Sequence, residues 1–77
     1  MTFEYKGSEA LEIIKERYLD WEIQLLNSRK LLFKIVLENN LDTPMEAFEF
    51  YLKNPKSIEQ TLLFLAALHL INLEKLK

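Results

Sequence analysis

The stretch that most constrains this sequence is the end of the chain, SIEQTLLFLAALHLINLEKLK. Within residues 62–71 the only polar side chain is that of His69. A capping box, Ser57 followed three residues later by Gln60, predicts that a helix begins here, and we assign it to residues 57–76. A helix that is apolar on nearly every side has to be covered by its own chain, by a partner or by lipid.

Projected as a helix, this segment carries two apolar stripes. The broad stripe comprises Ile58, Leu62, Leu65, Ala66, Leu70, Leu73 and Leu76. The narrow stripe comprises Phe64, Ala67, Leu68 and Ile71. We expect the rest of the chain to cover the broad stripe. The narrow stripe would then be exposed, which soluble monomers rarely tolerate, so we predict that it forms the interface of a homodimer or of a higher oligomer.

The largest element available to cover this helix is residues 8–38, which contain neither Pro nor Gly. Ser8 is a good N-cap residue, and acids in the first turn favour a helix start. Apolar residues then recur at alternating spacings of three and four, which is a heptad pattern. We therefore predict one long helix that packs on more than one neighbour. The weak point is Asn27-Ser28, where a break would turn three helices into four.

The remaining segments are short. Residues 1–7 alternate polar and apolar side chains without a second strand to pair with, so we predict a flexible arm. Thr43-Pro44 begins a short helix, residues 43–54, which Pro55 ends. The sequence therefore predicts one all-α domain, residues 1–77, that is a small helical bundle (long, short, long) completed by dimerisation.

Few residues of the chain are suited to catalysis or to metal binding. The chain has no Cys and one Gly, which excludes thiolate zinc sites and glycine-rich phosphate loops. As the only histidine, His69 could serve as a general base or a metal ligand, but it lacks partners at ligand spacing, so we interpret it as an imidazole at the edge of the core. We expect no enzyme activity, no cofactor and no metal.

Charge gives little reason to expect nucleic acid as a partner, since the formal net charge is −2. Arg29, Lys30 and Lys34 nevertheless form a basic cluster, a candidate patch for a partner protein or for nucleic acid. Acids predominate before this cluster. Two such helices would therefore attract each other when antiparallel, acidic end on basic end.

These observations favour a non-enzymatic protein–protein interaction module, such as an adaptor, an inhibitor or an antitoxin-like regulator, which binds itself and a further protein. The alternative is a dimeric DNA-binding transcriptional regulator that uses the basic cluster. An enzyme with a site between subunits is a third hypothesis. We expect a cytoplasmic location, because no signal peptide is visible and the apolar run of about 10 residues falls short of the roughly 20 that span a bilayer.

Overall fold

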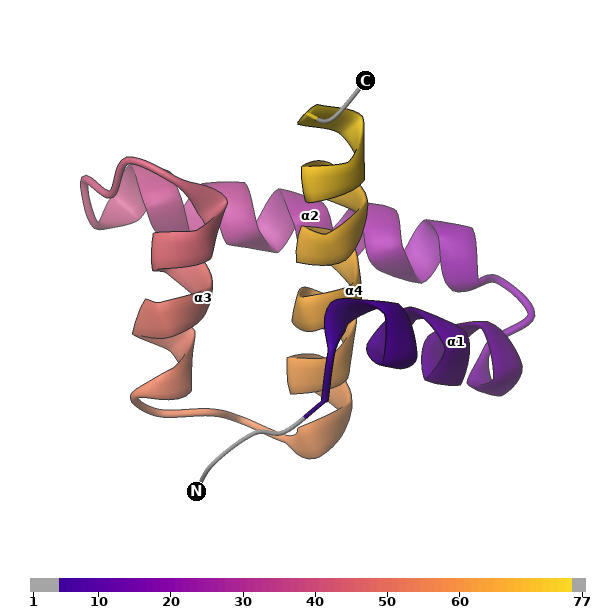
Figure 1. The fold of residues 1–77 in the computed structure, drawn as a ribbon. Helices are drawn as coiled ribbons and strands as arrows, with labels where there is room; N and C mark the ends of the chain where they lie inside the picture. The colour runs from indigo at the N-terminus through magenta and orange to yellow at the C-terminus, as the bar shows by residue number, and fades with distance from the viewer. Residues whose placement is uncertain (1–4, 76–77) are drawn as a thin grey trace.

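The computed structural model describes residues 5–75, which form four helices and no strand. They are α1 (Gly7–Arg17), α2 (Trp21–Glu38), α3 (Pro44–Leu52) and α4 (Ile58–Lys75). The all-helical class is thus confirmed. α4 lies at the centre, with α3 on one side and α1 on the other, while α2 crosses behind them (Figure 1). Most of the predicted arm, together with residue 76 of the predicted last helix, lies outside the described residues.

The predicted long helix of residues 8–38 is wrong, because the chain breaks at Tyr18 and Asp20 rather than at Asn27-Ser28. Tyr18 adopts an extended backbone conformation with φ −124° and ψ 126°. Residues 27 and 28 lie inside α2, and the Ser28 side chain is buried. A continuous helix over 8–38 would be about 46 Å long at 1.5 Å per residue. The longest dimension of the folded chain is 34 Å.

The break allows one segment of sequence to cover α4 from two directions. Ala10 and Ile14 of α1 pack with Leu62 of α4, whereas Leu32 of α2 packs with Phe64. A single straight helix would contact α4 along only one line. Because α4 is apolar on all sides, two shorter helices bury more of its surface. The break has an unfavourable local effect, because it leaves the apolar side chain of Leu19 exposed to water in the connection.

The sequence contains a signal for this break that the heptad pattern obscured. Asp20 is at the N-cap position of α2, and Glu22 lies in the first turn, as is usual at helix starts. Lys15 and Arg17 lie in the last turn of α1, where basic residues are favoured. At the other end of α1, the helix begins at Gly7, so Ser8 is not the N-cap that we predicted.

The starts of the last two helices agree with the prediction. The Oγ1 of Thr43 accepts a hydrogen bond from the Glu46 N–H at 3.2 Å, and Pro44 occupies the first position of α3. The Oγ of Ser57 accepts from the Gln60 N–H at 3.0 Å and caps α4. These local signals work because a cap satisfies backbone donors that no helix can satisfy internally.

Candidate protein-binding surface

The narrow stripe of α4, which we predicted to be an oligomer interface, is buried within the chain. Phe64, Ala67, Leu68 and Ile71 are each 5% exposed or less. α2 and α3 cover the stripe; the core cluster there includes Leu32, Phe48 and Tyr51. The expectation that the rest of the chain leaves this stripe uncovered is therefore wrong. The reason is tertiary: α3 and α2 pack against one side of α4 while α1 packs against the other.

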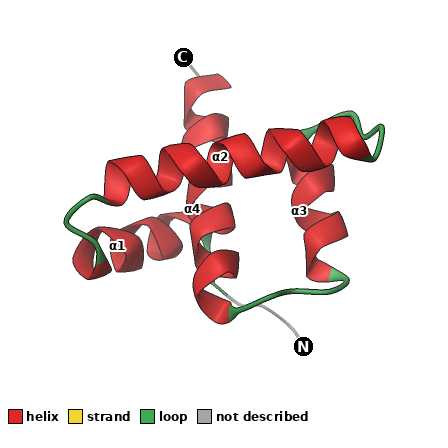
Figure 2. Cartoon of the chain, turned by 180° about the vertical axis from the view of Figure 1, so that it is seen from behind, coloured by secondary structure: helices red, strands yellow, loops and turns green. Residues whose placement is uncertain are grey.

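A line of exposed apolar side chains lies instead on the outer face of α2. Seen from behind, α2 runs across the full width of the molecule with no other helix in front of it (Figure 2). Four exposed apolar side chains of α2 follow one line along the helix: Ile23 is 58% exposed, Leu26 51%, Phe33 40% and Leu37 79%. We call these four residues, together with Lys30, the α2 stripe.

The α2 stripe has the spacing of a coiled-coil seam. Its members, residues 23, 26, 30, 33 and 37, are separated alternately by three and four residues, so they share one line along the helix. Leu19 is also fully exposed, but it lies in the connection before α2 and so is not part of the helical seam. The opposite side of α2 carries the buried residues Leu25, Ser28 and Leu32. α2 is therefore apolar on two faces, and the described chain covers only one.

The predicted basic cluster is divided by the fold. The Nη1 of Arg29 donates a hydrogen bond to Oε1 of Glu74 at 3.0 Å, and its guanidinium lies 5.9 Å from the Phe33 ring centroid. Lys30 and Lys34 are exposed, and neither forms an ion pair within residues 5–75. The patch therefore offers two free cations beside apolar side chains, which is little for phosphate contacts.

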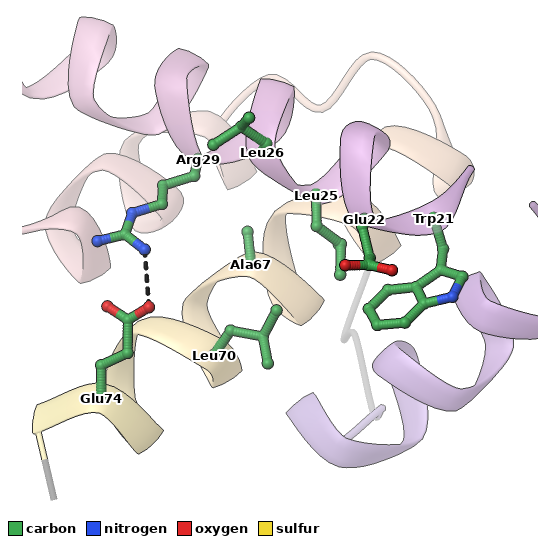
Figure 3. A pocket seen from close by; sticks show the side chains of 8 residues that line it. All are labelled: Trp21, Glu22, Leu25, Leu26, Arg29, Ala67, Leu70 and Glu74. Carbon is green, nitrogen blue, oxygen red and sulfur yellow. Dashed lines mark hydrogen bonds and ion pairs between the residues drawn. The ribbon is translucent and has the colours of Figure 1, made fainter. Parts of the chain in front are cut away.

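A pocket of about 300 Å³ lies along one flank of the α2 stripe, between α2 and α4. Figure 3 shows the Arg29–Glu74 ion pair at one end of it and the indole of Trp21 at the other, with Ala67 and Leu70 contributed by α4. The lining is mostly apolar, and Leu26 belongs to both the pocket and the stripe. The pocket thus extends the exposed apolar surface of α2 towards α4.

His69 lies away from this surface, against the first residue of α1. A Cβ placed on Gly7 would come within 3.1 Å of the His69 Nδ1. Among the described residues, no group of three or more His, Cys, Asp or Glu side chains is arranged to hold a metal ion. The half-buried imidazole therefore contacts the α1 backbone, and its proposed place at the edge of the core agrees with this contact.

None of the described helices combines the length and the hydrophobicity that crossing a membrane requires. No protein-family model, curated protein or solved structure shows significant similarity to this chain.

Proposed function

We propose that this chain is a protein–protein interaction module that acts as a homodimer, in which the α2 stripes of two copies pair antiparallel. The observation that carries the proposal is the exposed seam of Ile23, Leu26, Phe33 and Leu37, spaced as in a coiled coil. Contiguous exposed apolar surface of this kind marks interaction sites in soluble proteins.

A second copy fits the stripe because the seam is complementary to itself when reversed. The two helices of an antiparallel pair run in opposite directions, so the residue numbers of any two facing residues add up to the same total. If Ile23 faces Phe33 of the second copy, then Leu26 faces Lys30, and Leu37 lies near the connection that precedes α2 of the second copy. Every layer then contains one residue from each heptad seam position, as knobs-into-holes packing requires. The aliphatic stem of Lys30 covers Leu26 while its ammonium reaches water.

Charge also favours the antiparallel orientation. Asp20, Asn27 and Lys34 follow one flank of the stripe at intervals of seven residues and are all exposed. In the register above, Asp20 lies beside Lys34 of the second copy, and the two-fold axis repeats this pair. A parallel arrangement would instead place Lys30 directly beside Lys30, which repels. The Arg29 side chains of the two copies repel each other less strongly than this, because Glu74 of the same chain neutralises the charge of each.

The test is the mass in solution of the wild type and of two matched variants. Leu26→Glu places a charge on the stripe, whereas Met45→Glu changes a side chain of similar exposure on α3, 46% against 51%. We expect light scattering at tens of micromolar to give a dimer for the wild type and Met45→Glu, and a monomer for Leu26→Glu. Because association buries only part of each side chain, the dimer should dissociate on dilution.

Three outcomes would overturn the proposal. A wild type that is monomeric at this concentration shows that a second copy is not the partner. A dimer that survives Leu26→Glu but not Met45→Glu shows that another face is used. A monomer that shifts duplex DNA at physiological salt, where phosphate contacts are already weakened, would favour the transcriptional regulator instead.

A further inference from the structure

The connection between α1 and α2 is short and contains no residue that a helix excludes. It consists of Tyr18, Leu19 and Asp20, with neither Gly nor Pro. Tyr18 is extended, with φ −124° and ψ 126°, and Leu19 is fully exposed. The start of α2 has no side-chain cap, because Asp20 makes no capping hydrogen bond. A helix that continued through the connection would give the first N–H groups of α2 backbone partners.

The contacts of α1 with the rest of the chain are mainly contacts with α4. Ala10 and Ile14 pack with Leu62, and Gly7 lies against His69. α1 makes few contacts with α2. The connection lies at the edge of the molecule, where the chain turns back from α1 into α2 (Figure 1). The α1 helix of a second copy can therefore make the same contacts with α4, and only the connection has to change its conformation.

The side chains that pack towards α4 keep one helical phase across the connection. All of them are buried or half-buried. They alternate at spacings of three and four and are residues 11, 14, 18, 21, 25, 28 and 32. A break resets the rotation of one helix relative to the next, so the folded chain does not require this continuity. If the connection were helical, the same side chains would form one face of a single helix.

Such a face is too long for one copy of α4. A helix from Gly7 to Glu38 would be about 48 Å long, whereas the 18 residues of α4 extend for about 27 Å. The α2 half would stay on α4 of its own chain. The α1 half would reach beyond the molecule, and the surface that matches it is the side of α4 that α1 has left in a second copy.

We propose that the chain also forms a domain-swapped dimer, in which α1, the connection and α2 make one continuous helix and each α1 packs on α4 of the other copy. Leu11 and Ile14 of one copy then complete the core around Leu62 of the other. A short connection keeps α1 at an effective concentration in the millimolar range near its own α4, so the closed monomer predominates below that concentration. The swap does not use the α2 stripe and is independent of the dimer proposed above.

The experiment uses the Leu26→Glu protein, in which pairing through the α2 stripe is prevented. The protein is unfolded in denaturant, refolded at about 1 mM, diluted, and separated by size-exclusion chromatography with light scattering. We expect a fraction of dimer that dissociates slowly after dilution, because α1 must leave α4 before the two copies can separate. A dimer held only by exposed side chains would dissociate at once on dilution.

Three substitutions at position 19, each added to Leu26→Glu, test the continuous helix, since each removes the same exposed side chain. Residue 19 is helical only in the swapped form, and each dimer contains two such helices. Leu19→Gly should therefore lower the association constant about thirtyfold relative to Leu19→Ala. Leu19→Pro should lower it more than about a thousandfold.

The closed monomer should accept proline at this position. Tyr18 already has the extended conformation that proline imposes on the residue before it, and the Leu19 N–H donates to no backbone carbonyl of the described residues. We therefore expect similar melting temperatures for the three monomers. If Leu19→Pro does not fold, the comparison of Leu19→Ala with Leu19→Gly decides.

Two results would overturn the swap and leave the dimer of the α2 stripe untouched. One is that Leu19→Ala gives no slowly dissociating dimer after refolding at this concentration. The other is that the Ala, Gly and Pro variants give equal fractions of dimer. Conversely, if the wild type forms only a slowly dissociating dimer that Leu19→Pro abolishes, the swap is supported and the pairing of α2 stripes is overturned.

Discussion

Gly7, the first residue of α1, lies directly against His69 of α4: a Cβ atom placed on Gly7 would stand 2.7 Å from the Cβ of His69 and 3.1 Å from its Cγ. Real Cβ atoms essentially never come that close, so the single glycine of the chain lies at a close approach of α1 to α4. This contact fixes where α1 can begin along α4, and it explains a glycine at a position where the backbone needs no positive φ.

Gly7→Ala should therefore destabilise the protein, although Ala is the better helix former. Forcing an extra methyl group into a packed contact costs about 1–3 kcal/mol, which exceeds the helix propensity gain of up to about 1 kcal/mol. We expect urea unfolding to show a net loss of about 1 kcal/mol. Ser8→Ala, at the exposed neighbouring position, is the control and should not lose stability. An equally stable or more stable Gly7→Ala protein would mean that α1 is free to move along α4.

Tyr51→Phe should destabilise the α3–α4 connection. The Tyr51 hydroxyl accepts from the Lys56 N–H at 3.2 Å and pairs with Thr61 Oγ1 at 2.9 Å, so the variant leaves a backbone donor without its partner. We expect a loss of about 1–3 kcal/mol in the free energy of unfolding. Tyr18→Phe is the control, because its hydroxyl makes no hydrogen bond to the described residues. Equal losses for the two variants would contradict this role.

Leu68→Ala and Leu26→Ala should separate folding from association. Leu68 is 3% exposed within the chain, so its truncation leaves a cavity and should cost about 2–5 kcal/mol of stability at any protein concentration. Leu26 is 51% exposed, so its truncation should leave the stability of the monomer nearly unchanged while it weakens the dimer. Thermal melts at two protein concentrations, beside sedimentation, measure both effects. A reversed pattern would restore the narrow stripe of α4 as the interface.

Asn27→Cys should cross-link the dimer. In the antiparallel register, Asn27 of one copy lies beside Asn27 of the other, close to the two-fold axis, and the natural chain contains no cysteine. We expect mild oxidation to give a disulfide-linked dimer on a non-reducing gel. Asn72→Cys, exposed on α4, is the control and should remain monomeric on the gel. Rapid cross-linking of the control alone would place the dimer axis on α4.

Exchanging two charges tests the orientation of the pair. Lys34→Glu should weaken the dimer, because it places an acid beside Asp20 of the second copy. Adding Asp20→Lys should restore much of the affinity, since the pair is then attractive again. Asp20 makes no capping hydrogen bond to the α2 backbone, but its Oδ2 accepts from Gln24 Nε2 at 3.3 Å and its charge favours the start of α2, so Asp20→Lys alone is the control for the cost to folding. A double variant weaker than Lys34→Glu, measured by sedimentation at low salt, would exclude this register.

The sequence by itself determined what depends on neighbours along the chain. The starts of α3 and α4 are predictable because Thr43 and Ser57 satisfy backbone donors within three residues, and Pro44 and Pro55 act on their own backbone. The all-helical class, and the central place of a last helix that is apolar on all sides, likewise follow from periodicity and composition.

The sequence carries a local signal near Asp20, but only the tertiary structure decided that the first helix breaks there and which apolar stripe is left in water. Both depend on how α1, α2 and α3 share the surface of α4, which is a competition between distant segments for the same buried area. A heptad pattern is the same whether a helix continues or turns at Asp20. Leu68 and Leu26 each belong to an apolar stripe of their helix, so the stripe alone does not predict that Leu68 is 3% exposed and Leu26 51%. The chain buries the first and exposes the second because α2 can turn only one of its two apolar faces towards α4.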